Sequence, residues 1–168
     1  GRILGAGEPK YLNSPDTVLF DKGRTLYNID RAGPASRQAG RLIVVEGYMD
    51  AITLAQAGFT QTVAPLGTAL TEAQLALLWK LADEPILCFD GDAAGERAAY
   101  RAALRALPLL KPGKSLRIVS LPKGEDPDSL VRRAGAGAFA AALAGARPLD
   151  EVVWLLEASS GKHDTPER

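Results

Sequence analysis

The sequence has very few of the residues that form covalent cross-links or sulfur-rich metal sites. Among 168 residues it contains one cysteine, Cys88, and one histidine, His163. A single cysteine excludes both a disulfide within the chain and a zinc site built from cysteines. His163 lies in a polar tail and makes no metal site alone. We therefore expect no zinc in this segment, and we expect Cys88, which lies inside an apolar run, to fill the core.

Long apolar runs are also missing. No stretch approaches the roughly 18 residues that a membrane-spanning helix needs. The opening residues Gly1-Arg2-Ile3-Leu4 do not form a signal peptide. The sequence thus predicts a cytoplasmic protein with no membrane partner. Because the chain does not begin with methionine, we expect it to be a fragment.

The sequence also lacks a net charge, because 20 Lys and Arg balance 20 Asp and Glu, but these residues are unevenly distributed along the chain. Residues 1–45 carry 7 Lys and Arg against 4 Asp and Glu, residues 46–92 carry 1 against 7, and residues 93–168 carry 12 against 9. An acidic centre between basic arms suits a metal site that handles phosphates. A uniformly basic face would instead have indicated passive nucleic-acid binding.

What is present divides the chain into three parts. In residues 1–40, glycine and proline interrupt every regular pattern, which predicts a loop-rich arm. Residues 41–145 alternate strand and helix patterns, and residues 146–168 begin another helix and end in a polar tail. The alternation predicts βαβ units in a compact Rossmann-like α/β domain, whose mainly parallel sheet is flanked by helices.

The patterns also give approximate bounds. The expected strands are 42–45, 62–64, 86–89 and 116–121. The expected helices are 48–57, 71–82, 93–107, one or two within 129–146, and 149–158. Thr71 and Gln74 form a capping-box pattern at the start of the second helix. Trp79 and Trp154 fall on helical stripes, which predicts that both face the core.

Acidic residues follow three of the expected strands. Glu46 comes after the first, Asp90 and Asp92 flank Gly91 after the third, and a cluster at 125–128 follows the last. The carboxyl ends of parallel strands meet at one edge of a sheet, where ligands bind. Carboxylates gathered there repel one another unless a cation is present, so the pattern predicts a site for divalent metal.

Six sequence blocks in a fixed order resemble the Toprim domain of primases and topoisomerases and, more narrowly, the bacterial DnaG-type primases. The resemblance covers about residues 1 to 157. One departure is Asp21, where the family pattern often has histidine. The blocks are Pro9-Lys10-Tyr11-Leu12-Asn13-Ser14-Pro15, Phe20-Asp21-Lys22-Gly23-Arg24, Val45-Glu46-Gly47-Tyr48-Met49-Asp50, Leu66-Gly67-Thr68, Phe89-Asp90-Gly91-Asp92 and Pro122-Lys123-Gly124-Glu125-Asp126-Pro127-Asp128.

This resemblance implies a DNA-directed RNA polymerase that makes short RNA primers by metal-dependent nucleotidyl transfer. Mg²⁺ or Mn²⁺ would be the cofactor, with two or more ions. Glu46, Asp90 and Asp92 would be the catalytic metal ligands. Asp126 and Asp128 would hold a second ion, and Asp50 would share that ion or orient water. The nucleotide pocket, which by the same resemblance accepts guanosine tetraphosphate, would be lined by Lys10, Tyr11, Asn13, Lys22 and Tyr48, with Arg24 nearby.

The resemblance also assigns domains and partners. Residues 1–40 would end the primase N-terminal core subdomain, 41–145 would form the Toprim domain, and 146–168 would start a helical subdomain. The expected partners are a single-stranded DNA template, ribonucleoside triphosphates and the RNA primer, and, through the full-length protein, the replicative helicase and single-strand-binding protein. The protein would work in the cytoplasm, at the replisome or nucleoid.

Several alternatives remain open from the residues alone. Asp126 before Pro127 is also typical of a helix N-cap, and Asp90-Gly91-Asp92 is also typical of a turn. The basic residues of the arm could form only a solvated face, and Tyr48 could simply pack. At the level of function, the alternatives are a Toprim nuclease or topoisomerase piece, or a non-catalytic nucleotide-sensing module.

Overall fold

A computed structural model describes residues 17–66 and 69–159 of the chain. The helices and strands follow in the order η1 (Lys22–Arg24), β1 (Leu26–Tyr27), α1 (Ile29–Ala39), β2 (Ile43–Val44), α2 (Tyr48–Gln56), β3 (Thr62–Pro65), α3 (Glu72–Leu81), β4 (Ile86–Cys88), α4 (Ala93–Ala106), η2 (Leu107–Leu109), β5 (Arg117–Val119), α5 (Pro127–Ala144), β6 (Arg147–Pro148) and α6 (Leu149–Ser159).

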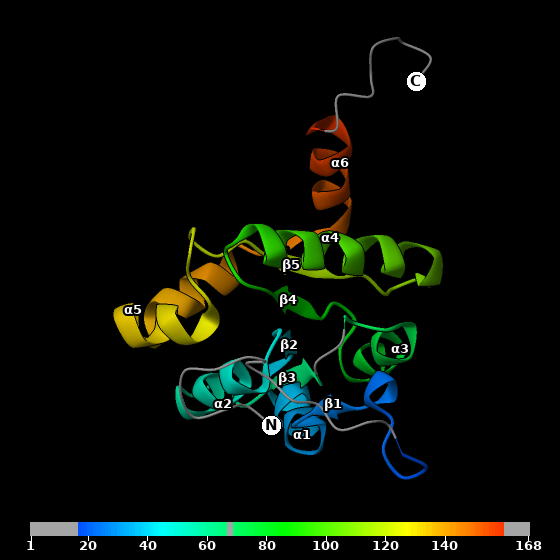
Figure 1. The fold of residues 1–168 in the computed structure, drawn as a ribbon, viewed down its shortest axis with the longest axis horizontal. Coiled ribbons are helices and arrows are strands. Elements are labelled where there is room, and N and C mark those ends of the chain that lie inside the picture. The colour runs from blue at the N-terminus through cyan, green and yellow to red at the C-terminus, as the bar shows by residue number, and fades with distance from the viewer. Residues whose placement is uncertain (1–16, 67–68, 160–168) are drawn as a thin grey trace.

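Within residues 17–66 and 69–159, six strands form one sheet in the order β1-β3-β2-β4-β5-β6. The four inner strands are parallel, and only the two edge strands, β1 and β6, run antiparallel to their neighbours. The chain leaves β2 into α2 and returns at β3, whereas it leaves β4 into α4 and returns at β5 on the other side (Figure 1). The strand order therefore reverses between β2 and β4.

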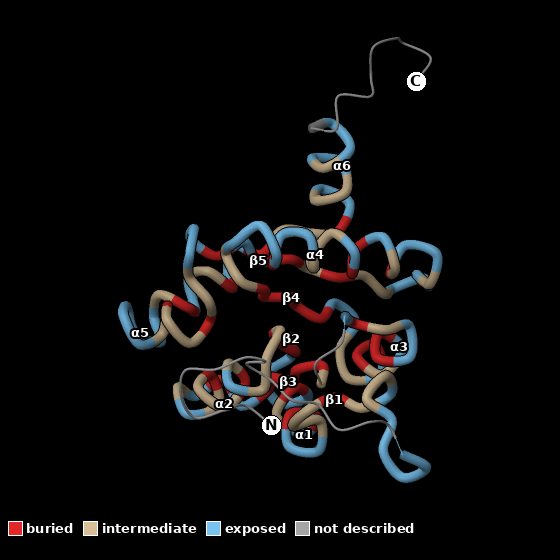
Figure 2. The backbone as a smooth tube through the Cα atoms, viewed as in Figure 1, coloured by how far each residue is buried: buried red, intermediate tan, exposed pale blue. Residues whose placement is uncertain are grey.

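Helices cover both faces of the sheet. Val44, Leu87 and Ile118 point into one core with the buried sides of α1, α3 and α4. Their neighbours in sequence, such as Ile43 and Cys88, point into a second core with α2 and α5. Alternate residues of each strand thus enter opposite layers. Figure 2 shows the buried residues gathered along β2 to β5. The predicted fold class, a mainly parallel sheet between helices, is confirmed.

Local sequence signals fix many of the element ends. Thr71 accepts a hydrogen bond from the Gln74 N–H, and the Gln74 side chain accepts one from the Thr71 N–H, which confirms the predicted capping box. Gly58 adopts a φ of 97°, which favours glycine, just after α2. In α5, the backbone leaves the helical region at Gly135, where φ is 79°. The sequence predicted one or two helices here, and α5 consists of two helical segments joined by this kink.

Two predictions fail. Residues 29–39 form α1 although the sequence predicted loops there, and Pro34 lies inside this helix. A buried face at Ala32 and Ser36 holds the helix against the core, which outweighs the local preference of glycine and proline. Trp79 is buried at 9% exposure as predicted, but Trp154 on α6 is 73% exposed. A helical stripe shows that residues share a face, not that another element covers that face.

Residues 17–40 share the sheet with the rest of the chain. β1 pairs with β3, and Ala32 of α1 lies in the same core as α3. At the other end, β6 pairs with β5 before α6 begins. The division of the chain at residues 40 and 145 therefore remains a proposal. Within the described ranges, no helix is both long and apolar enough to cross a membrane.

Candidate active site

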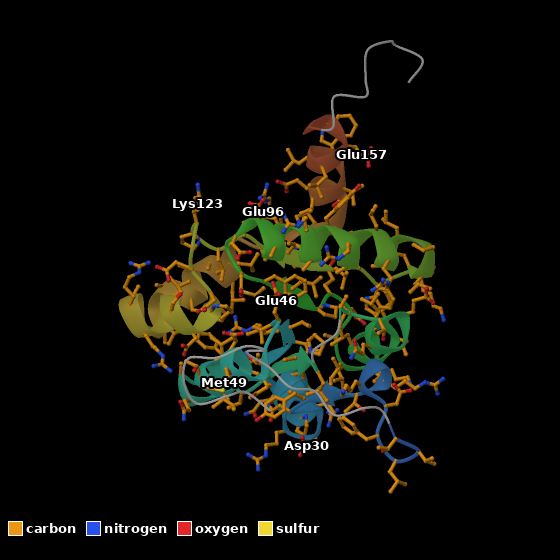
Figure 3. All side chains as sticks on the ribbon, in the orientation of Figure 1. Asp30, Glu46, Met49, Glu96, Lys123 and Glu157 are labelled. Atoms are coloured by element: carbon orange, nitrogen blue, oxygen red, sulfur yellow. The ribbon has the colours of Figure 1, made fainter. Side chains whose placement is uncertain are left out.

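Glu46 and Asp90 lie beside each other where the strand order reverses. β2 and β4 are adjacent and parallel, with Val44 opposite Leu87, so both residues follow at the same edge of the sheet. The backbone N–H of Asp90 donates a hydrogen bond to Glu46 Oε1 over 3.3 Å. Figure 3 places Glu46 in the centre of the molecule beside β4. This is the position at which open α/β sheets bind their ligands.

The carboxyl groups of this edge are close enough to affect each other's ionisation. Burial, followed by the charges of Glu46, Asp50, Asp126 and Asp92, raises the pKa of Asp90 to about 7. Burial, then mainly the charge of Asp126, raises the pKa of Asp50 to about 6. The pKa of Glu46 is also raised, chiefly by burial. The acidic residues from three loops thus form one electrostatic cluster, as the sequence predicted.

Asp92 has a structural role that the sequence analysis did not assign. It is the N-cap of α4, and its Oδ1 accepts hydrogen bonds of 2.8 Å from the N–H groups of Ala94 and Gly95. A capping carboxylate satisfies backbone donors and complements the helix dipole. One oxygen of Asp92 is therefore used by α4, and the cap bonds leave Oδ2 unused.

The acidic loop after β5 is tied to the loop after β4. Gly91 N–H donates to the Glu125 carbonyl over 2.7 Å, and Gly124 N–H donates to the Gly91 carbonyl over 2.8 Å. Asp126 caps α5 through Ser129, so the cap interpretation of this residue is confirmed. These bonds hold the second acidic loop against the first.

Asp128 and Glu125 are engaged by basic or hydroxyl side chains. Asp128 Oδ1 accepts hydrogen bonds from Thr53 Oγ1 over 2.6 Å and from Arg132 Nε over 2.7 Å. The Glu125 carboxylate is bonded by Ser129 and Arg133, and these bonds lower its pKa. Thr53 connects α2 to α5 at the site, and no sequence motif pointed to it.

The cluster is an open shelf rather than a closed cage. Among the residues that the structure describes, no three His, Cys, Asp or Glu side chains are arranged so as to hold a metal ion. The donor set nevertheless fits Mg²⁺ or Mn²⁺, because it consists of carboxylates whose pKa values are raised partly by mutual repulsion. Mg²⁺ needs few protein carboxylates and keeps several water or phosphate ligands.

Gly91 is required by a close approach of two backbone segments. A Cβ atom at this position would lie 2.1 Å from the Pro122 carbonyl oxygen. At Gly95, a Cβ would lie 2.1 Å from the Asp90 carbonyl oxygen. Gly91 does not adopt a positive φ, so it serves the contact between loops rather than a left-handed turn. The Asp-Gly-Asp pattern alone could not reveal this contact.

Part of the basic side of the site lies within the residues that the structure describes. Lys22 lies in η1, and its carbonyl accepts a hydrogen bond of 2.9 Å from Gln74 Nε2, which also donates to the Thr25 carbonyl. Gln74 is fully buried and so fixes the turn that carries Lys22. Arg24 is paired with Asp21, and the Tyr48 ring packs against Tyr27 at 5.9 Å. Lys10, Tyr11 and Asn13 lie outside the described residues.

Two family models match this chain. Residues 40–120 match the Toprim domain, and residues 1–33 match the N-terminal domain of the DNA primase catalytic core. The DNA primase of Neisseria meningitidis serogroup A is 50% identical over 155 residues, which cover 92% of this chain and 26% of that protein. The chain belongs to the bacterial DnaG-type primase family.

Solved primase structures share the fold of this family member. The E. coli primase catalytic core is 46% identical with a TM-score of 0.90, over 99% of this chain and 53% of that chain. A DnaG primase catalytic domain solved with bound single-stranded DNA is 45% identical with a TM-score of 0.89, over 99% and 54%. This chain thus spans about a quarter of the curated primase and about half of the solved catalytic cores.

Proposed function

We propose that this chain is a fragment of the catalytic core of a DNA primase, which synthesises short RNA primers on a DNA template by metal-dependent nucleotidyl transfer. The observation that carries the proposal is the juxtaposition of Glu46 and Asp90 at the point where the strand order reverses. Membership of the primase family supports the same reaction.

In this proposal, Glu46, Asp90 and Asp92 hold the catalytic Mg²⁺ or Mn²⁺, Asp126 and Asp128 hold a second ion, and Asp50 shares that ion or orients water. When bound, the metal would lower the pKa of the attacking 3′-hydroxyl and neutralise charge on the pyrophosphate leaving group. The protein contributes position: β2 and β4 fix Glu46 and Asp90, and the Asp92 cap fixes the start of α4.

Lys22 and Tyr48, with Lys10, Tyr11 and Asn13, would contact the incoming nucleotide. Lysine suits a phosphate as a mobile point charge. The proposed partners are the template strand, ribonucleoside triphosphates and the primer. Replicative helicase and single-strand-binding protein would act through the full-length protein, in the bacterial cytoplasm. The primase catalytic domain solved with single-stranded DNA supports the template as a partner.

The test is primer synthesis by a full-length primase that carries this segment. Template-directed synthesis of short RNA in Mg²⁺ or Mn²⁺ is expected, and Asp90→Ala should abolish it while the 168-residue chain with the same substitution stays folded. Undiminished synthesis by Asp90→Ala would overturn the metal assignment. Metal-dependent cleavage of DNA without synthesis would favour a Toprim nuclease, and nucleotide binding without either reaction would favour a sensing module.

A further inference from the structure

A small hollow adjoins the acidic shelf on the side of α4. Its volume is about 270 Å³. Glu46 and Phe89 line it from the strand ends, and Pro65 and Leu70 line it from the segment after β3. Among the described residues that line it, Glu46, Arg101 and Arg105 carry charge and the others are apolar. Two arginines and one carboxylate thus line the same hollow, and the rest of its described lining is apolar.

The helix geometry explains why these arginines face the hollow. Residues four apart lie on neighbouring turns of one face, so Arg97, Arg101 and Arg105 form a row along α4. An α-helix turns 3.6 residues per turn, so the row drifts around the helix. Arg97 at its start does not line the hollow, whereas Arg101 and Arg105 do. Ala98 and Ala102 lie beside the two arginines, and their small side chains leave the space open.

The two arginines differ in how they are held. Arg105 donates through Nη1 to the carbonyl of Leu70, which anchors its side chain at the wall. Arg101 is exposed, and within the described part of the chain no hydrogen bond or ion pair holds its guanidinium. The charge of Arg101 acts to lower the pKa of the Glu46 carboxyl group, although burial outweighs this effect and no ion pair joins the two side chains. A guanidinium has five N–H donors.

We propose that Arg101, with Arg105 behind it, receives a phosphate group in this hollow beside the acidic shelf. A planar guanidinium matches the geometry of phosphate through paired N–H donors. The phosphate belongs either to a ribonucleoside triphosphate or to the backbone of a nucleic-acid strand. This inference rests on the proposed function, because it extends the same site by a cationic wall. Arg101 is then a binding residue that no motif of the sequence marked.

The chain offers a matched control for the test. Arg97 is the same residue type on the same helix, one turn earlier, but it does not line the hollow. Because both side chains are exposed, neither substitution should unfold the protein, which thermal unfolding of each variant checks. The variants are Arg101→Ala, Arg101→Lys and Arg97→Ala in the 168-residue chain.

Binding is measured by fluorescence anisotropy with two ligands, a labelled ribonucleoside triphosphate and a labelled single-stranded oligodeoxynucleotide, both in Mg²⁺. Arg101→Ala should weaken one of them about tenfold or more, as expected for a lost hydrogen bond to a charged group. Arg101→Lys should retain part of the affinity, and Arg97→Ala should stay within about twofold, since a rim charge contributes little. Loss for the triphosphate identifies a nucleotide phosphate, and loss for the oligonucleotide identifies a strand.

Three results would overturn the inference: unchanged binding of both ligands by Arg101→Ala, an equal loss in Arg97→Ala, or a wild-type chain that binds neither ligand. The proposed function is checked separately on the same samples, because a rise in melting temperature with Mg²⁺ depends on the carboxylates rather than on Arg101. If that rise is absent in the wild-type chain, the metal assignment fails. If it is present and Arg101→Ala binds normally, only the inference fails.

Discussion

Single glycines decide how closely the acidic loops can approach each other. At Gly91 the nearest obstacle to a side chain is a backbone carbonyl, which cannot move aside as a flexible side chain could. That carbonyl belongs to Pro122, in the loop that continues to Glu125, and the Glu125 carbonyl accepts a hydrogen bond from the Gly91 N–H. The positions of Asp90, Asp92 and Asp126 therefore depend on a residue that carries no functional group.

Gly91→Ala should lower the free energy of unfolding by about 1–3 kcal/mol, since the added methyl forces the two loops apart. The matched control is Gly137→Ala in α5, where a Cβ meets nothing within 4 Å. There the substitution should stabilise the helix by about 0.5–1 kcal/mol. Chemical denaturation of the two variants measures both values. A Gly91→Ala protein as stable as wild type would show that the loops can separate freely.

Helix ends link stability to the proposed metal site. Asp92 caps α4 and is also a proposed ligand, so replacing it with alanine removes two functions at once. Asparagine caps helices about as well as aspartate but does not carry the charge. The two substitutions therefore separate the cap from the metal role.

Asp92→Ala should cost about 0.5–2 kcal/mol of unfolding free energy, whereas Asp92→Asn should stay close to wild type. Both variants should bind Mn²⁺ more weakly, because each lacks the carboxylate charge. Denaturant unfolding and a Mn²⁺ titration followed by electron paramagnetic resonance measure the two effects. Normal Mn²⁺ affinity in Asp92→Asn would remove Asp92 from the set of ligands.

Elements with strong local signals were predictable, and elements formed by tertiary contacts were not. The capping box at Thr71 and the glycine after α2 mark their helix ends in the sequence itself. In contrast, α1 contains Gly33 and Pro34 and forms because its buried face fits the core. The acidic strand ends predicted the cluster, but the bonds of Thr53 and Gln74 and the place of Arg101 in the hollow depend on packing between distant segments. No local pattern encodes that packing.

At the scale of the whole molecule, the ionised carboxylates of the acidic edge lower the stability of the fold. Asp90 and Asp50 have pKa values of about 7 and about 6 in the folded state, against 3.8 for an ordinary aspartate, chiefly because they are buried and secondarily because they lie near other carboxylates. A group whose pKa is higher in the folded state binds its proton more tightly there. Its contribution to stability is therefore complete at low pH and is lost as the pH rises through the folded pKa.

In EDTA, the difference in unfolding free energy between wild type and Asp90→Asn should change between about pH 4 and pH 7. The wild-type protein should lose stability relative to the variant over this range, because only the wild-type protein acquires the negative charge at residue 90.

Bound Mg²⁺ should oppose this loss of stability at high pH, since a ligand that binds only the folded state stabilises it. The rise in melting temperature with Mg²⁺ should thus be larger at pH 8 than at pH 5, where protons compete for the same oxygens. Melting curves at both pH values, with and without Mg²⁺, measure this directly. An equal rise at the two pH values would mean that Mg²⁺ binds somewhere other than the carboxylates of this edge.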